Sequence, residues 1–329
     1  MYSLFNRILP IGAISFPDLS ITMEAMLLYI IYTVSAFIFL FCAISTYLKG
    51  TSNGQKILIF FAILFTDHII WGPIQCGNSS LLVLILLIFA MDYKDSPSRY
   101  KREIALILIA IASGIKVYPC VFGLLYLREK RWKDALRLII YGIFFFFMPF
   151  SFFGGIDGLL QFFKNQFQIQ TSHTGIEIWT FNSLFCYISH TAPDILWTKI
   201  LTLLIGAVIL VVFLLAPLEK WEQFFLLVSI IVLIPLWSGP YTLSYFALPL
   251  LTFINQLSSS QNITAGKRSL HWLYLIFFAF LFSSSTFLEL LGDGKTTFIK
   301  YCSLYFALLV LIISIMHTAL HKYHIQHHS

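Results

Sequence analysis

Lys116 is the residue most suited to chemistry, because it interrupts a long apolar run from Ile104 to Leu127. A lysine ammonium group in the hydrocarbon region of a membrane costs about 2.5–3.5 kcal/mol, and charges retained there usually have a function. Its natural ligand is an anion, and a phosphate at the depth of the lipid headgroups would suit it. Tyr118 could add a hydroxyl donor to the same ligand. In the simpler alternative, Lys116 only extends to the membrane surface.

A polar stretch, Gln75 to Ser80 (QCGNSS), comes directly before another apolar run. It places amide side chains and backbone N–H groups at the amino end of a predicted helix, where the helix dipole favours negative charge. Asn78 is therefore a candidate to bind the same anion as Lys116, with Gln75 as a cavity residue. Asn78 could also serve only as the N-cap of the helix.

Asp67 and His68 interrupt a weaker apolar segment, Lys56 to Trp71. They could be a carboxylate and an imidazole that face a cavity and transfer protons. An internal hydrogen-bonded pair would explain the two residues equally well.

Further candidates lie in the longest polar stretch, Gly154 to Asp194, and at a later break in the apolar pattern, Trp237 to Tyr241 (WSGPY). Both segments combine polar groups with aromatic rings, the mixture that sugar rings and lipid headgroups meet. The alternatives are ordinary loop polarity and a tight turn with interfacial aromatic residues. The cavity residues that we predict in these segments are His173, Glu177, Asn182 and Tyr241.

Histidines recur near the carboxyl end, and a helical tail would place them on one face that could bind a transition metal. They are His317, His321, His324 and His328. A cytoplasmic tail with fortuitous metal affinity is the simpler interpretation, so we assign no metal site. The five cysteines show no paired spacing and are interpreted as apolar filler residues without metal or redox function. We expect no cofactor.

The composition assigns these residues to a membrane protein. Charged residues make up 11% of the chain, under half of the ~25% typical of soluble proteins, and apolar residues make up 59%. The net charge of +6 is spread over short loops and forms no basic face, which excludes a nucleic-acid binder. The apolar runs predict an all-α polytopic bundle of about eleven membrane segments, some of them short or re-entrant.

The distribution of basic residues favours a hairpin rather than a single crossing at Ile104 to Leu127. As one crossing, the Lys and Arg residues would divide 10 to 10 between the two sides of the membrane. As two short helices folded back at Gly114 to Pro119, they divide 15 inside to 5 outside, with Lys116 at the apex. Glycine and proline make such a turn plausible where protein or water satisfies the backbone.

This threading predicts one integral membrane domain over residues 1–329. Residues 1–22 and 154–194 would lie outside, and the His-rich tail, 318–329, would lie in the cytoplasm. Leu159 to Phe167 could form an amphipathic helix along the interface. The first residues contain no cleavable signal, and an external start with no preceding helix is awkward, so we expect part of the native chain to be missing.

The segment from Gln75 to Arg137 resembles glycosyltransferase family 87, the polyprenol-phosphate-mannose-dependent mannosyltransferases of the GT-C class. The resemblance rests on QCGNSSLLVLILLIFA, SRYKRE, IASGIKVYP and LYLREKRWKDALR, in which Asn78, Lys116, Pro119 and Arg131-Trp132 match family positions. Later, Phe181-Asn182-Ser183-Leu184 and WSGPYTLSYFALPLL are similar to further family segments. The glycine and glutamine of the first motif are displaced here.

The resemblance implies an inverting transfer, in which an acceptor hydroxyl attacks the anomeric carbon and polyprenyl phosphate leaves. Lys116 would stabilise the departing charge, with Tyr118 and Asn78 also at the donor phosphate. GT-C enzymes usually carry the base in a first outer loop after a first membrane helix, and we expect this sequence to lack both. The external-side carboxylates near the amino end are Asp18 and Asp67, neither of which matches a family motif, and Asp67 is our candidate for the base. The donor would be a polyprenyl-phosphate hexose, with mannose as the expected sugar, and the acceptor a lipid-linked glycan or glycolipid. We expect a multi-pass protein among the lipids of a bacterial inner membrane, with its site facing outward.

Two rival functions remain open. A lipid or anion transporter or flippase could use Lys116 as its anion site, but we find no second half that repeats the broken helix. A polysaccharide polymerase should carry basic residues in its long outer loop, and Gly154 to Asp194 contains only Lys164.

Overall fold

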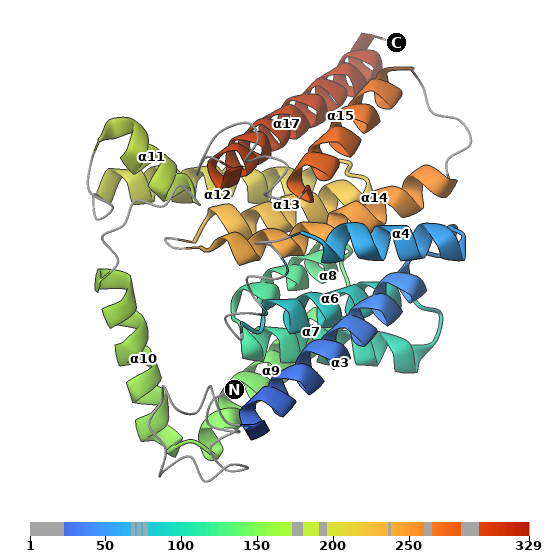
Figure 1. Ribbon diagram of the computed structural model, residues 1–329. Helices are drawn as coiled ribbons and strands as arrows, with labels where there is room; N and C mark the ends of the chain where they lie inside the picture. Colours follow the sequence, from blue (N-terminus) through green and yellow to red (C-terminus); the bar gives the residue numbers. More distant parts are fainter. Residues whose placement is uncertain are drawn as a thin grey trace.

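The computed structural model describes residues 23–66, 70, 74, 78–172, 180–190, 196–235, 238–259, 265–283 and 296–328. These residues form helices and no β-strand (Figure 1), which confirms the all-α prediction. Among them, four helices are long and apolar enough to cross a membrane: Met26–Tyr47, Trp132–Ser151, Leu196–Leu215 and Lys300–Thr318. Asn53–Leu64 and Leu270–Leu281 are shorter apolar helices. The larger number of about eleven segments stays a prediction.

The amino-terminal half of the bundle is organised around α7 (Arg99–Ile115). On its two sides pack α6 (Ser80–Lys94) and α9 (Trp132–Phe147). α3 (Met23–Tyr47) packs against α6 and is followed by α4 (Asn53–Leu64) (Figure 1). Because the apolar residues of α6 face several neighbours, most of this helix is buried. Its amino end is thereby fixed beside the end of α7.

The chain turns back where α7 ends, as we predicted from the glycine and proline of the segment Gly114 to Pro119. Lys116 is extended, and a 3-10 helix, η3 (Tyr118–Gly123), then leads into the short α8 (Leu124–Arg128). Pro119 lies in the first turn of η3, where its missing N–H leaves no bond unmade. A Cβ atom at Gly114 would lie 2.7 Å from the carbonyl oxygen of Phe145, so only glycine allows this close approach of α7 to α9.

Ion pairs join the two basic loops at the other end of this hairpin. Lys94 pairs with Glu129, and Arg137 pairs with Glu103, so each pair links one basic loop region with the other. Both loops therefore lie on the same side of the bundle. A single straight crossing between them is excluded, and the hairpin interpretation is confirmed.

The carboxyl-terminal half is held together by buried aromatic rings. Its elements are α12 (Leu196–Leu215), α13 (Lys220–Leu233), η5 (Pro240–Phe246), α14 (Ala247–Ser259), α15 (Ala265–Leu281) and α17 (Thr296–His328). Phe225 of α13 contacts Phe246 of η5 and Phe277 of α15, with ring centroids 5.2 and 5.7 Å apart. Trp221 contacts Tyr274 in the same way at 4.7 Å. These rings fix η5, which also packs against α6.

The polar stretch from residue 154 to 194 contains two helices, α10 (Gly155–Ser172) and α11 (Phe181–Ser189). The amphipathic helix predicted at Leu159 to Phe167 lies within α10. This helix stands apart from the bundle (Figure 1) and is attached by Phe162, whose ring contacts Phe150 at 5.8 Å. The external position of the stretch stays a prediction.

The two ends of the chain fall partly outside this description. Residues 1–22 lie outside the described residues. Helix α17 continues to His328, but the side chains of His321, His324 and His328 lie outside the described part.

Candidate functional site at the hairpin tip

The tip of the hairpin holds Lys116 against the amino end of α6. The Nζ atom donates to Asn78 Oδ1 at 2.6 Å and to Ser80 Oγ at 2.7 Å. It also lies 4.6 Å from the centroid of the Tyr241 ring and 5.7 Å from that of Tyr118. The ammonium group therefore has amide, hydroxyl and aromatic neighbours. Lys116, Tyr118 and Asn78, which we predicted to share one ligand, lie together, and Tyr241, predicted as a cavity residue, lies beside them.

Asn78 is fixed by its own hydrogen bonds. Its Oδ1 atom accepts from the backbone N–H of Ser80 at 3.1 Å and from the Ser80 hydroxyl at 2.8 Å, besides the bond from Lys116. Helix α6 begins at Ser80 with Ser79 as its N-cap, so Asn78 lies one residue before the position predicted for it. The amide oxygen still satisfies a backbone donor of the first turn, which is the task of a capping side chain.

Three tyrosines form one wall of the site. The hydroxyl groups of Tyr118 and Tyr245 are 3.2 Å apart, and their rings pack edge to face with centroids 5.7 Å apart. Tyr245 and Tyr241 both belong to η5, so the aromatic core that fixes η5 also positions this wall. Tyr118 thus shares its hydroxyl with a neighbour rather than standing alone beside Lys116.

The electrostatic character of the tip follows from these partners. Within the described ranges, no carboxylate forms an ion pair with Lys116; its bonded partners are neutral oxygens. A cation that is half-buried and bonded only to neutral groups keeps its attraction for an anion. The hydroxyl and amide groups next to it can bond the oxygens of the same anion. The arrangement can bind an oxyanion and stabilise negative charge as it develops.

Several predicted residues are not placed at this site. Asp67, His68, Gln75, His173 and Glu177 lie outside the described residues. Their roles stay predictions.

Asn182 is described and buried in α11. Its Oδ1 atom accepts from the hydroxyl of Thr198 at 2.7 Å, which ties α11 to α12. Its role in a cavity stays a prediction.

The sequence argument missed Ser80 and Tyr245. Ser80 was visible as part of the QCGNSS stretch, directly before the apolar run. Tyr245 follows Tyr241 by four residues in a segment broken by proline, and this spacing was the available signal. Their importance depends on the contact of η5 with α6, which no local sequence pattern indicates.

One family model matches the chain, that of glycosyltransferase family 87, over residues 10–261. The match includes Asn78, Ser80, Lys116, Tyr118 and Tyr245. No curated protein and no solved structure shows a significant match. With its apolar spanning helices, the chain is an integral membrane protein, and it belongs to glycosyltransferase family 87.

Proposed function

We propose that this protein transfers a hexose, most simply mannose, from a polyprenyl-phosphate donor to a lipid-linked glycan or glycolipid, with inversion at the anomeric carbon. The observation that carries the proposal is the Lys116 ammonium group, held at the hairpin tip by Asn78 and Ser80 without a carboxylate among its described partners. Membership of the glycosyltransferase family supports a transferase over a transporter or a polymerase.

The chemistry assigns each group a task. An acceptor hydroxyl attacks the anomeric carbon and loses its proton to a base, while the bond from that carbon to the phosphate oxygen breaks. The leaving polyprenyl phosphate takes the bonding electrons. Lys116 lies where it can neutralise that charge, and a fixed cation is most effective in a site of low dielectric constant. Asp67 is the base that we propose.

The side of the membrane follows from the charges of the loops. The basic loops at the base of the hairpin indicate the cytoplasmic side, so the tip with Lys116 would face outward. An outward site suits a donor carried by a lipid, because the sugar is delivered within the membrane. We propose a bacterial inner membrane as the location, with membrane lipids, the polyprenyl-phosphate sugar and a lipid-linked acceptor as partners.

The test is hexose transfer by the purified protein in lipid nanodiscs. Replacing Lys116 by alanine should lower kcat by about 10²–10³-fold, the loss typical when one group stabilising a developing charge is removed. Lys116→Arg keeps the charge and should retain part of the activity. Wild-type turnover by Lys116→Ala, with the thermal midpoint unchanged, would refute the role of this lysine.

A further inference from the structure

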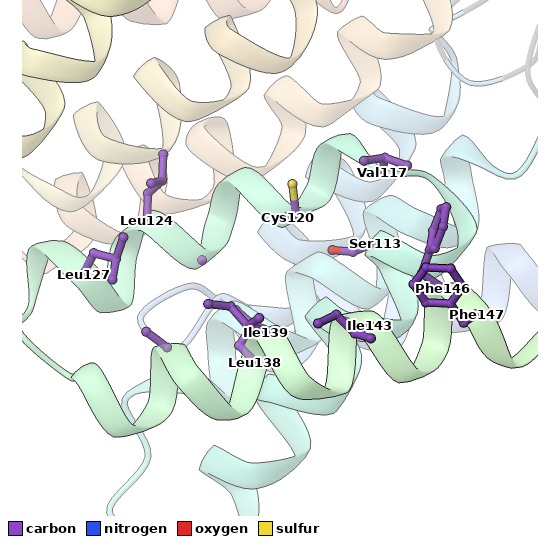
Figure 2. Close-up of a pocket in the computed structure, with 13 residues that line it drawn as sticks. Ser113, Val117, Cys120, Leu124, Leu127, Leu138, Ile139, Ile143, Phe146 and Phe147 are labelled. Atoms are coloured by element: carbon purple, nitrogen blue, oxygen red, sulfur yellow. The ribbon is translucent and has the colours of Figure 1, made fainter. Parts of the chain in front are cut away.

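An apolar groove lies between the returning arm of the hairpin, Val117 to Leu127, and α9. Its volume is about 380 Å³. Figure 2 shows Val117 and Phe146 near one end and Leu127 at the other, with Ile139 and Ile143 of α9 along its length. Among the lining residues, Ser113 contributes the only side-chain oxygen, and this hydroxyl already donates to the Ile109 carbonyl at 2.8 Å.

The groove begins beside the proposed phosphate site. Val117, the residue after Lys116, and Ser113, three residues before it, both line the groove. The turn that carries Lys116 therefore also forms one end of the groove. A molecule with an anionic head and an apolar chain could place its head at Lys116, pass over Val117 and continue into the groove.

The open side of the groove faces the lipid. Ile139 and Ile143 are 58% and 56% exposed, and they belong to a helix that is apolar and long enough to cross the membrane. Exposed apolar side chains on such a helix are expected to contact lipid. An apolar chain could thus enter sideways from the bilayer. No polar group would have to be desolvated during entry.

Gly142 keeps the middle of the groove open. It is a lining residue of α9, and a Cβ atom built on it would meet nothing within 4 Å. Glycine inside a helix destabilises it by roughly 1 kcal/mol relative to alanine, so an interior glycine calls for a local reason. Here the missing side chain is what leaves the space unfilled.

We infer that this groove holds the first part of the hydrocarbon chain of the same lipid phosphate whose head binds at Lys116. The inference rests on the proposed function. The volume of the groove is at the lower end of the roughly 300–1,000 Å³ typical of small-molecule sites. It can therefore hold only part of a long prenyl chain, and the rest of the chain lies in the bilayer. Lipid tails are as apolar as the groove, so no hydrophobic gain drives the chain in. The groove instead orients the donor and fixes its phosphate at the tip.

The test is photo-crosslinking in nanodiscs, with a prenyl phosphate that carries a diazirine in its chain. We expect mass spectrometry to find the label in residues 117–127 and 132–147. Gly142→Phe fills the groove and should reduce this label at least fivefold, and Ile143→Trp should do the same if Gly142→Phe is unstable. Gly54→Phe is the matched control, since Gly54 is also a helical glycine whose added Cβ meets nothing within 4 Å.

Two outcomes would overturn the inference. In the first, the label in these segments is unchanged in Gly142→Phe and in Ile143→Trp. In the second, phosphatidylcholine with the same diazirine labels the groove as efficiently as the prenyl phosphate, which would make it a site for ordinary lipids.

The transfer assay separates this inference from the proposed function. A protein that labels in the groove but moves no hexose contradicts the proposed function alone. A protein that transfers hexose without label in the groove contradicts the inference alone. When both hold, Gly142→Phe should lower kcat/KM about tenfold for a long-chain donor and leave a donor with a single prenyl unit little affected, because the short chain does not extend to Gly142.

Discussion

The two ends of the hairpin carry basic residues in opposite surroundings. At the base, Lys94, Arg131 and Arg137 each pair with at least one carboxylate. At the tip, Lys116 is bonded to an amide and a hydroxyl oxygen. Cations at the base are neutralised by the protein itself, so they hold two loops together. The cation at the tip keeps its charge for another partner. The type of partner, rather than the presence of a basic residue, therefore distinguishes a structural end from a binding end.

The energetics of burial explain why the difference matters. Breaking a buried ion pair by removing one partner is strongly destabilising, since it leaves an uncompensated charge. A buried cation with neutral partners destabilises the unliganded protein but becomes favourable when an anion arrives. We expect substitutions at the base to change stability and substitutions at the tip to change activity.

The largest effect is expected when Lys116 at the tip is given a carboxylate partner, as the cations at the base of the hairpin have. Asn78→Asp would place a carboxylate where Oδ1 now accepts from Lys116, and the resulting ion pair would compete with a donor phosphate. We expect transfer to fall on the order of 100-fold or more, as for removal of the lysine itself, while the thermal midpoint stays equal or rises. Asn78→Ala removes the oxygen without adding charge and should lose less activity. Equal losses in the two variants would contradict this account.

The next effect is expected at the base. The Lys94 side chain is 4% exposed and pairs with Glu129 and Asp95. Lys94→Met should lower the free energy of unfolding in detergent by about 2–3 kcal/mol, somewhat less than for a fully buried pair because both carboxylates are partly exposed.

Lys220→Met is the control for Lys94→Met. This lysine also pairs with Asp95, but its side chain is 65% exposed, so the loss should stay below about 1 kcal/mol. Transfer activity per folded molecule should be kept in both variants. An inactive but fully stable Lys94→Met would remove the distinction between the two ends.

A smaller effect is expected for Ser80→Ala. The Ser80 hydroxyl accepts from Lys116 and donates to Asn78, so its loss leaves the ammonium group less firmly held. We expect roughly a tenfold fall in kcat/KM, which corresponds to about 1.4 kcal/mol. Ser79→Ala is a close control, since Ser79 is the N-cap but makes no side-chain capping bond. If both variants kept wild-type kinetics, the hydroxyl would have no part in positioning Lys116.

The smallest effect is expected at acid pH, for a carboxylate at the loop end of the hairpin. Burial alone would raise the pKa of the Asp95 carboxyl, but hydrogen bonds from Lys220 and Lys94 lower it below its ordinary value of 3.8. A carboxyl with a lowered pKa in the folded state stabilises the protein above the ordinary value, and this stabilisation is lost as the pH falls through the folded value.

Thermal midpoints of the wild type and Asp95→Asn should therefore differ by a constant amount above about pH 5 and converge as the pH falls below 3.8 and through the lowered pKa. The associated loss should not exceed about 1 kcal/mol, because the Asp95 side chain is partly exposed. A difference that grows on acidification would have the wrong sign for this interpretation.

Part of this architecture could be predicted from the sequence. The hairpin followed from the balance of basic residues and from the glycine and proline near Lys116, because these constraints are local or depend on composition. The assignment of Asn78 and Lys116 to one site followed in part from two polar groups that each interrupt an apolar pattern. The second prediction rests on the energetic penalty of a polar group among apolar ones.

Other features could not be predicted in this way. Hydropathy marks a short apolar helix and a spanning helix alike, so the count of about eleven segments stays a prediction beside the four helices of spanning length among the described residues. The polar stretch from 154 to 194 was expected to be mainly a loop, yet α10 and α11 occupy much of it. Tyr245 enters the site only because α13 and α15 hold η5 in place, and such long-range packing leaves no mark in a local pattern.

Lys116 is already immobilised before any substrate is bound. Ordering a long, flexible side chain costs up to about 2 kcal/mol of conformational entropy, and here the bonds to Asn78 and Ser80 meet that cost during folding. An incoming headgroup consequently encounters a preorganised positive charge and needs no search among rotamers. Recognition at this tip should therefore be limited by how the lipid diffuses in the plane of the bilayer rather than by rearrangement of the protein.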